Sequence, residues 1–276
     1  MKNFLALMLL FVTSAGWAAP TTVHPFALVM IDDASEAKYG GFPIDRALVA
    51  QAVDKLAAAG ARAVVLKFFY DLPSNSASDA ALASAIGKTR VLLQARVDDS
   101  EARPNRIPDR FAVNVPAGPV AISGKSGWVP LPLFSNRAHN IGLVDVTSAD
   151  RVPAYERLAD KNYLSLTVAT LSVALGDAPL AIQPAKQLRI GQKSIVLDDK
   201  SQIVLSQSVF DDADNTPYFS FADVVDGKAS LQSLRGKVVV IGYHGSKMQS
   251  ISTRAGAIKA HLAFWLGLLD AWAQLQ

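Results

Sequence analysis

The 276-residue chain contains no cysteine, which excludes disulfide scaffolds and any zinc or iron–sulfur site held by thiolates. Charged residues are also scarce, at 18% against about a quarter in typical globular proteins. The 27 basic and 24 acidic residues are mixed along the chain and leave a net charge of only +3, so a nucleic-acid interface is not expected. Half of the residues are apolar, which is enough to bury a core and argues against disorder.

The sequence also lacks the short motifs that identify common cofactor and metal sites. Neither a G-x-G-x-x-G nor a G-x-S-x-G pattern occurs. No two of the four histidines have the spacing of a metal-binding helix. We therefore predict no cofactor and no metal. We interpret His261, which lies in an apolar segment, as a hydrogen-bonded residue of the core.

The N-terminus has the pattern of a secretory signal peptide. Lys2 precedes an apolar run over residues 4–12, and the small residues Gly16 and Ala18 fit a cleavage site after Ala18. The alternative is an uncleaved anchor, but the run is shorter than the roughly 20 residues that span a bilayer. Because no later segment is apolar enough to span, we expect a signal peptide at 1–18 and a soluble, periplasmic mature protein at 19–276.

The rest of the chain alternates between apolar runs typical of buried strands and segments of helical periodicity. Strands are predicted at 27–31, 63–69, 91–95, 141–146 and 237–242, and helices at 45–59, 79–86, 163–175, 220–227 and 257–273. Residues 98–139 form an irregular excursion with a short strand at 120–122, and residues 187–207 form a hairpin or meander. This order predicts one α/β domain with a mostly parallel central sheet, flanking helices and a β-rich insertion.

Ligands of open parallel sheets bind beyond the carboxyl ends of the strands, so the polar residues there are the candidate site. The candidates are Asp32, Asp33, Ser35, Lys67, Asp71, Arg96, Asp145, Tyr243, His244 and Thr253. Together they would form a cleft of mixed charge for a small polar molecule or anion. The alternative is structural: the carboxylates would cap the helices that follow them or pair with Lys67 and Arg96.

Two other functions remain open. Asp32 and Asp33, with Asp71 and Asp145, could hold a divalent cation in a metal-dependent hydrolase. Alternatively, the apolar C-terminal helix could dock onto a partner or a membrane surface through Phe264, Trp265, Leu268 and Trp272, unless it is a core helix that covers the sheet.

Several motifs, in order, resemble the second type of CHASE domain, a sensory extracellular domain associated with cyclases and histidine kinases. Residues 29–35 (VMIDDAS) resemble its opening strand, and 41–46 (GFPIDR) resemble its helix entry. Residues 56–64 (LAAAGARAV) are similar to its helix-to-strand junction, and 234–242 (LRGKVVVIG) to its late strand. Thr253 and His261 fall where the family tends to have Thr-Pro and a helical histidine. The resemblance covers about residues 26–270 and implies a non-catalytic sensor.

The chain departs from that family at positions that bear charge. Lys67 stands where the family usually has an aspartate, Arg254 replaces the proline after Thr253, and Gln249 and Ser250 replace an upstream acid. If those acids serve a ligand, the site here is more positive and prefers an anion. Such domains normally precede membrane helices and a kinase or cyclase, and this sequence has neither up to Gln276. The resemblance thus implies a free-standing module that acts through a separate inner-membrane signalling protein.

Overall fold

The computed structural model describes residues 24–211 and 213–276. In this part of the chain, the largest sheet has seven strands in the order β15-β1-β16-β2-β3, where β3 also pairs with β7 and β6. All neighbours are parallel except β3 and β6. The strands are β1 (Phe26–Ile31), β2 (Ala63–Leu66), β3 (Val91–Val97), β6 (Gly127–Trp128), β7 (Asn140–Leu143), β15 (Phe219–Ser220) and β16 (Val238–Tyr243).

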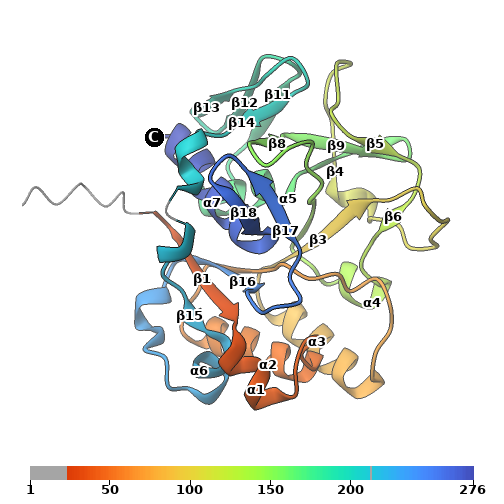
Figure 1. Cartoon of the computed structure of the whole chain (residues 1–276). Coiled ribbons are helices and arrows are strands. Elements are labelled where there is room, and N and C mark those ends of the chain that lie inside the picture. The colour runs from red at the N-terminus through yellow and green to blue at the C-terminus, as the bar shows by residue number, and fades with distance from the viewer. Residues whose placement is uncertain (1–23, 212) are drawn as a thin grey trace, which may run out of the picture.

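Helices cover both faces of this sheet (Figure 1). One face carries α1 (Asp33–Tyr39), α2 (Arg46–Ala58), α3 (Ser76–Lys88) and α6 (Phe221–Asp226). The opposite face carries α5 (Leu166–Ala174) and α7 (Ala260–Gln274). Strands such as β1 and β16 are buried on both faces, which explains why they are continuous apolar runs in the sequence. The predicted fold class, a mostly parallel sheet between helices with added β structure, is confirmed.

The added β structure forms small sheets around α5 and α7 (Figure 1). One sheet contains β4 (Ala112–Val113), β5 (Ser123–Gly124), β9 (Tyr155–Leu158) and β10 (Lys161–Leu164). A second contains β11 (Leu180–Gln183), β12 (Gln187–Ile190) and β13 (Lys193–Val196). The pairs β8 (Arg151–Pro153) with β14 (Gln202–Val204) and β17 (Ser250–Thr253) with β18 (Gly256–Lys259) complete the set, and a one-turn helix, α4 (Pro132–Ser135), precedes β7.

Several predicted boundaries were wrong for local physical reasons. The helix predicted at 79–86 runs from Ser76 to Lys88 as α3, because the Asn75 side chain caps it by accepting from the N–H groups of Ala77 and Ser78, and Gly87 lies inside the helix. The strand predicted at 120–122 is absent, and the pairing there begins at Ser123. The helix predicted from 163 starts at Leu166, because residues 161–164 pair with β9 as β10. Residues 257–259 likewise belong to β18 rather than to α7.

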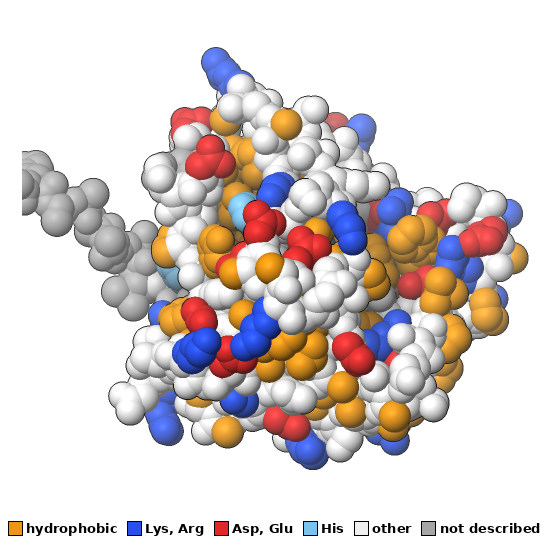
Figure 2. Space-filling view, turned by 60° about the horizontal axis from the view of Figure 1, so that its bottom comes forward, with side chains coloured by type: hydrophobic (Ala, Val, Ile, Leu, Met, Phe, Trp, Pro, Cys, Tyr) orange, Lys and Arg blue, Asp and Glu red, His pale blue; other side chains and the backbone are white. Residues whose placement is uncertain are grey.

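None of the described helices combines the length and the hydropathy that a bilayer crossing requires. The predicted signal peptide at 1–18 lies outside the described residues. On the face drawn in Figure 2, basic and acidic side chains are interspersed, without a continuous basic stripe.

Candidate functional site

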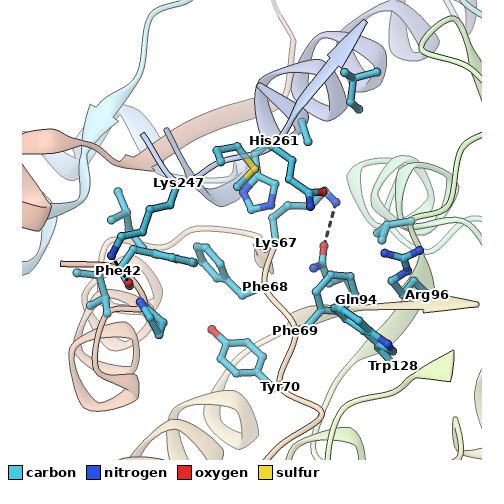
Figure 3. Close-up of a pocket in the computed structure, with 18 of the residues that line it drawn as sticks. Phe42, Lys67, Phe68, Phe69, Tyr70, Gln94, Arg96, Trp128, Lys247 and His261 are labelled. Carbon is cyan, nitrogen blue, oxygen red and sulfur yellow. Dashed lines mark hydrogen bonds between the residues drawn. The ribbon is translucent and has the colours of Figure 1, made fainter. Parts of the chain in front are cut away.

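A cavity of about 660 Å³ opens at the carboxyl ends of β2, β3 and β7. Its floor comes from the residues that follow these strands, and its sides come from the loop before α2, the segment between β16 and β17, and the start of α7. This is the edge at which ligands bind in parallel α/β sheets, and the volume suits a small organic molecule. We call this cavity the strand-end pocket. Figure 3 shows its principal side chains.

Lys67 directly follows β2 and lies in the floor of the pocket with only 7% of its surface exposed. Its Nζ donates to Oε1 of Gln94 at 2.9 Å (Figure 3) and lies 4.8 Å from the centre of the Phe264 ring. Burial lowers the pKa of Lys67 to about 7, and the nearby charge of Asp145 opposes this effect only in part. Lys67 is therefore an amine that is only partly protonated at neutral pH.

Arg96 and Asp145 form the far wall of the pocket. The guanidinium of Arg96 packs 5.1 Å from the ring centre of Trp128, and its Nε lies 3.7 Å from Oδ1 of Asp145. That Nε has no hydrogen-bond partner among the described residues. Asp145 accepts from the backbone N–H of Val97 at 2.7 Å. Burial raises the pKa of Asp145, while this hydrogen bond and the two neighbouring cations lower it.

Behind Asp145 lies Glu156, a fully buried carboxyl group on β9. Burial and the neighbouring charge of Asp145 raise the pKa of Glu156 well above its usual range. Neither carboxyl oxygen of Glu156 has a hydrogen-bond partner among the described residues, so a negative charge there would be buried and unpaired, and the protonated form is favoured. Asp145 is the acid of the two that faces the pocket.

The remaining walls are aromatic, with a basic rim. Phe42, Phe68, Phe69, Tyr70 and Trp128 line the cavity. Phe42 stacks on Tyr243 with ring centres 4.0 Å apart, which fixes the loop before α2. At the rim, Nζ of Lys247 donates to the carbonyl oxygen of Phe42 at 2.9 Å (Figure 3).

Arg46 also lines the pocket, but its charge is already matched. Its Nη1 lies 2.7 Å from Oδ1 of Asp79, and both side chains are largely buried. Arg46 therefore contributes packing to the pocket wall rather than a free charge.

His261, in the first turn of α7, also lines the pocket. Its Nδ1 accepts the backbone N–H of Tyr243 at 2.9 Å, so the neutral ring carries its proton on Nε2. Burial and the charge of Lys67 lower the pKa of His261 well below its usual range. The prediction of a hydrogen-bonded histidine is confirmed. The pattern of the sequence did not indicate that it also reaches the pocket.

The structure brings together three of the ten predicted site residues, Lys67, Arg96 and Asp145. Asp32, Asp33 and Ser35 lie instead at the start of α1, directly after β1, and do not line the pocket. Asp32 caps α1, because its Oδ1 accepts from the N–H and the hydroxyl of Ser35 at 3.0 and 2.6 Å and from Ser220 at 3.0 Å. The structural alternative, helix capping, therefore describes Asp32.

The other four predicted residues also have structural partners. Asp71 pairs with Arg103 at 2.8 Å and anchors the irregular segment. Tyr243 is buried behind the pocket wall and donates to Glu36 at 3.0 Å. His244 lies beside Tyr218 at the end of β16, with ring centres 5.8 Å apart. Thr253 donates to the carbonyl oxygen of Gly256 at 2.8 Å in the β17–β18 hairpin.

The acid cluster needed for a metal-dependent hydrolase does not form. Asp71 is paired with Arg103 and Asp145 lies in the strand-end pocket, whereas Asp32 and Asp33 are at the end of β1. No group of three potential metal-ligating side chains occurs within residues 24–211 and 213–276.

The predicted docking helix is α7, and it covers one face of the sheet. Trp265 and Leu268 are buried in the core of this same chain, with 3% and 0% exposure. Phe264 lies under Lys67, and Trp272 packs edge-on against Phe26. The alternative, a core helix, describes these four residues, and they form no exposed docking surface.

Sequence reasoning missed most of the aromatic wall. Phe42, Trp128 and His261 come from a loop, a short strand and a helix far apart in the chain, so no local pattern links them. Gln94 was detectable, because it precedes Arg96 by two residues and therefore lies on the same face of β3.

A family model described as the CHASE2 domain matches residues 5–255 of this chain. No curated protein and no solved structure matches it. The match covers most of the sequence and includes every strand of the main sheet, the floor of the pocket and Lys247 at its rim. The chain therefore belongs to the CHASE2 family of sensory domains.

Proposed function

We propose that this domain is an extracytoplasmic, non-catalytic sensor whose strand-end pocket binds a small organic anion with an aromatic body. The observation that carries the proposal is the charge of the pocket. Lys67 and Lys247 line it with no carboxylate within 4 Å among the described residues, and Arg96 has only the 3.7 Å approach to Asp145, which is the one acidic side chain among the described lining residues. The remaining charged lining residue is Arg46, and the charge of Arg46 is neutralised by Asp79.

A bound anion would supply the negative charge that the cations of this pocket lack. Among the described residues, Lys67 has no carboxylate within 4 Å, and its buried amine loses protonation as a result. A ligand carboxylate near Lys67 and Arg96 would favour the charged form of the amine and form charge-assisted hydrogen bonds. The aromatic side chains would then cover an apolar or aromatic remainder of the ligand.

A thermal-shift comparison tests this proposal with two matched probes, phenylacetate and the neutral phenylacetamide. Binding that is specific to the native state raises the melting temperature, and saturation at 100 times Kd corresponds to about 2.7 kcal/mol. Phenylacetate should stabilise the protein and phenylacetamide should not. Equal stabilisation by both would show that charge is not recognised, and no response to a broad panel of organic anions would contradict the proposal.

A matched pair of variants tests the role of Arg96. Arg96→Gln should weaken binding about 10- to 100-fold, because a hydrogen bond to a charged group contributes about 1.5–3 kcal/mol. Arg189→Gln is the control, since Arg189 is exposed on β12, outside the pocket. Equal affinities of the two variants would contradict the role of Arg96.

The proposal also includes export of the protein to the periplasm and a membrane protein that receives its signal. The family's sensory role and the N-terminal sequence pattern support a periplasmic location, with cleavage after Ala18 and a separate inner-membrane signalling protein as the receiver. Crosslinking of a C-terminally tagged chain in its own cells should recover a membrane kinase or cyclase. Recovery of proteins without a signalling domain would contradict this part.

A further inference from the structure

Lys67 lies in a setting that favours covalent chemistry as well as charge recognition. It follows Leu66, which pairs with Leu93 of β3, so Lys67 is the cross-strand neighbour of Gln94. Its amine is bound to the amide oxygen of Gln94 and lies against the Phe264 ring, and Lys67 itself lines the cavity. A buried lysine without a carboxylate partner is the setting that produces nucleophilic amines.

The groups that face this amine leave its lone pair available. Asp145 follows β7 and is held by the N–H of Val97 and by Arg96. His261, on α7, is neutral, and its Nδ1 is already bonded to Tyr243. Burial lowers the pKa of Lys67 to about 7, so a large fraction of the amine is unprotonated at neutral pH.

Arg96 lines the same pocket as Lys67 and comes from the neighbouring strand. Gln94 and Arg96 are two residues apart on β3, so their side chains project from the same face of the sheet. Arg96 lies two residues beyond the position opposite Lys67 on a parallel neighbour, so a strand spacing of about 4.8 Å and a rise of about 3.3 Å per residue put their backbones about 8 Å apart, and both residues line the pocket. The two can therefore engage adjacent functional groups of one ligand.

We propose that Lys67 captures an aromatic 2-oxo acid as a reversible imine, with the ligand carboxylate bound by Arg96. This inference rests on the proposed anion-binding function and names the ligand class for the same pocket. A 2-oxo acid has its carbonyl carbon directly bonded to the carboxylate, which matches an amine beside a guanidinium. The aromatic walls formed by Phe42, Phe68 and Trp128 suit an aryl substituent on the third side.

The chemical step balances without an oxidant or a cofactor. The neutral Nζ attacks the carbonyl carbon and forms a C–N bond, and one N–H proton passes to the carbonyl oxygen. The resulting carbinolamine loses its hydroxyl together with the second N–H proton, which gives one water and a C=N bond. Hydrolysis reverses both steps, so the captured ligand can leave again, as a sensor requires.

Reductive trapping tests the inference on the full chain. Incubation with phenylpyruvate and cyanoborohydride should add one ligand minus one oxygen atom to the intact mass, and peptide mapping should place the adduct on Lys67. The exposed Lys88 and Lys200 serve as internal controls in the same digest. Lys67→Arg, which keeps the charge but cannot form this imine, should abolish the adduct. Equal labelling of the exposed lysines, or no adduct on Lys67, would overturn the inference.

A second measurement uses the unsubstituted protein, so it does not require that a variant folds. The initial trapping rate at Lys67 should rise with pH through about pH 7, where half of the amine is unprotonated, and level off about one to two pH units higher, where the unprotonated fraction is nearly complete. Asp145, Arg96 and His261 face the amine, and Glu156 lies behind Asp145, so the profile reports this group of residues as a whole. A rate that keeps rising to pH 10, as for an exposed lysine, would overturn the inference.

Phenyllactate separates this inference from the function on which it rests, because it has a hydroxyl group in place of the carbonyl. If phenyllactate stabilises the protein and phenylpyruvate is not trapped at Lys67, the imine is wrong and anion binding stands. If phenyllactate and phenylacetate both fail to stabilise it, the proposed function is wrong. Trapping confined to Lys67 together with stabilisation by phenyllactate supports both.

Discussion

Asp32 and Asp33 are adjacent in the sequence but have different surroundings in the fold. The Asp32 carboxylate accepts hydrogen bonds from Ser35 and Ser220 and joins the start of α1 to the end of β15. Asp33 is exposed in the first turn of α1. A ligand-binding role would make both acids functional, whereas the observed contacts assign Asp32 to capping.

Alanine substitutions at the two positions should therefore differ in their effect on stability. Asp32→Ala should lower the free energy of unfolding by about 1–2 kcal/mol, the usual cost of losing an N-cap. Asp33→Ala should change it by at most about 0.5 kcal/mol, as for most exposed positions. Chemical denaturation of both variants measures the difference. Equal, small effects would contradict the capping role of Asp32.

At the same scale, the sequence predicts a pocket residue only where a strand end marks it. Lys67, Arg96 and Asp145 were predictable, because polar residues directly after buried strands must lie at one edge of the sheet. Asp32 and Asp71 satisfy the same rule but are used by a helix cap and an ion pair. A sequence pattern cannot separate these uses, because the partners Ser220 and Arg103 are distant in the chain.

Among the elements, the strands of the main sheet were the most predictable. β1, β2, β3, β7 and β16 each coincide with an apolar run, because burial on both faces requires apolar residues at every position. The short strands β8, β9 and β10 were missed, because β-pairing partners can be far apart and pairs of three or four residues leave little pattern. α1 was missed for a similar reason, since its seven residues bury only Ser35.

Alanine substitutions at two glycines test the contact between β7 and α5 and the C-terminal end of α3. Gly142, in β7, lies against the backbone of Leu166 at the start of α5, where an added Cβ would overlap backbone atoms. Gly142→Ala should therefore push α5 away from the sheet and destabilise the protein by about 1–3 kcal/mol. Gly87→Ala is the matched control: Gly87 lies inside α3, and an added Cβ would meet only the Arg137 side chain at 3.6 Å. It should stabilise the protein by about 0.5–1 kcal/mol.

Melting curves of both variants measure these changes. A neutral Gly142→Ala variant would show that β7 and α5 are not in close contact. A destabilised Gly87→Ala variant would show that the backbone at Gly87 is not helical, in line with the sequence-based prediction of a helix that ends at residue 86.

At the scale of the whole molecule, the pocket is lined by residues of α2 and α7, from the two helical layers, and of β17, at one edge of the sheet. Its floor belongs to buried strands, whereas Lys247, Gln249 and Ser250 are exposed and lead into the hairpin. A ligand held at Arg96 and covered by Lys247 would join a rigid part of the fold to its exposed segment.

Hydrogen exchange should therefore report pocket occupancy unevenly across the molecule. Amides of exposed segments with few buried contacts exchange through local opening, so a ligand in contact with them slows their exchange most. With saturating phenyllactate, peptides covering residues 245–259 should exchange more slowly, whereas the remote sheet of β11, β12 and β13 should not change. The Arg96→Gln variant, at the same ligand concentration, should lose the effect. Equal protection of both regions would indicate global stabilisation alone and would exclude the hairpin as the segment that responds to the ligand.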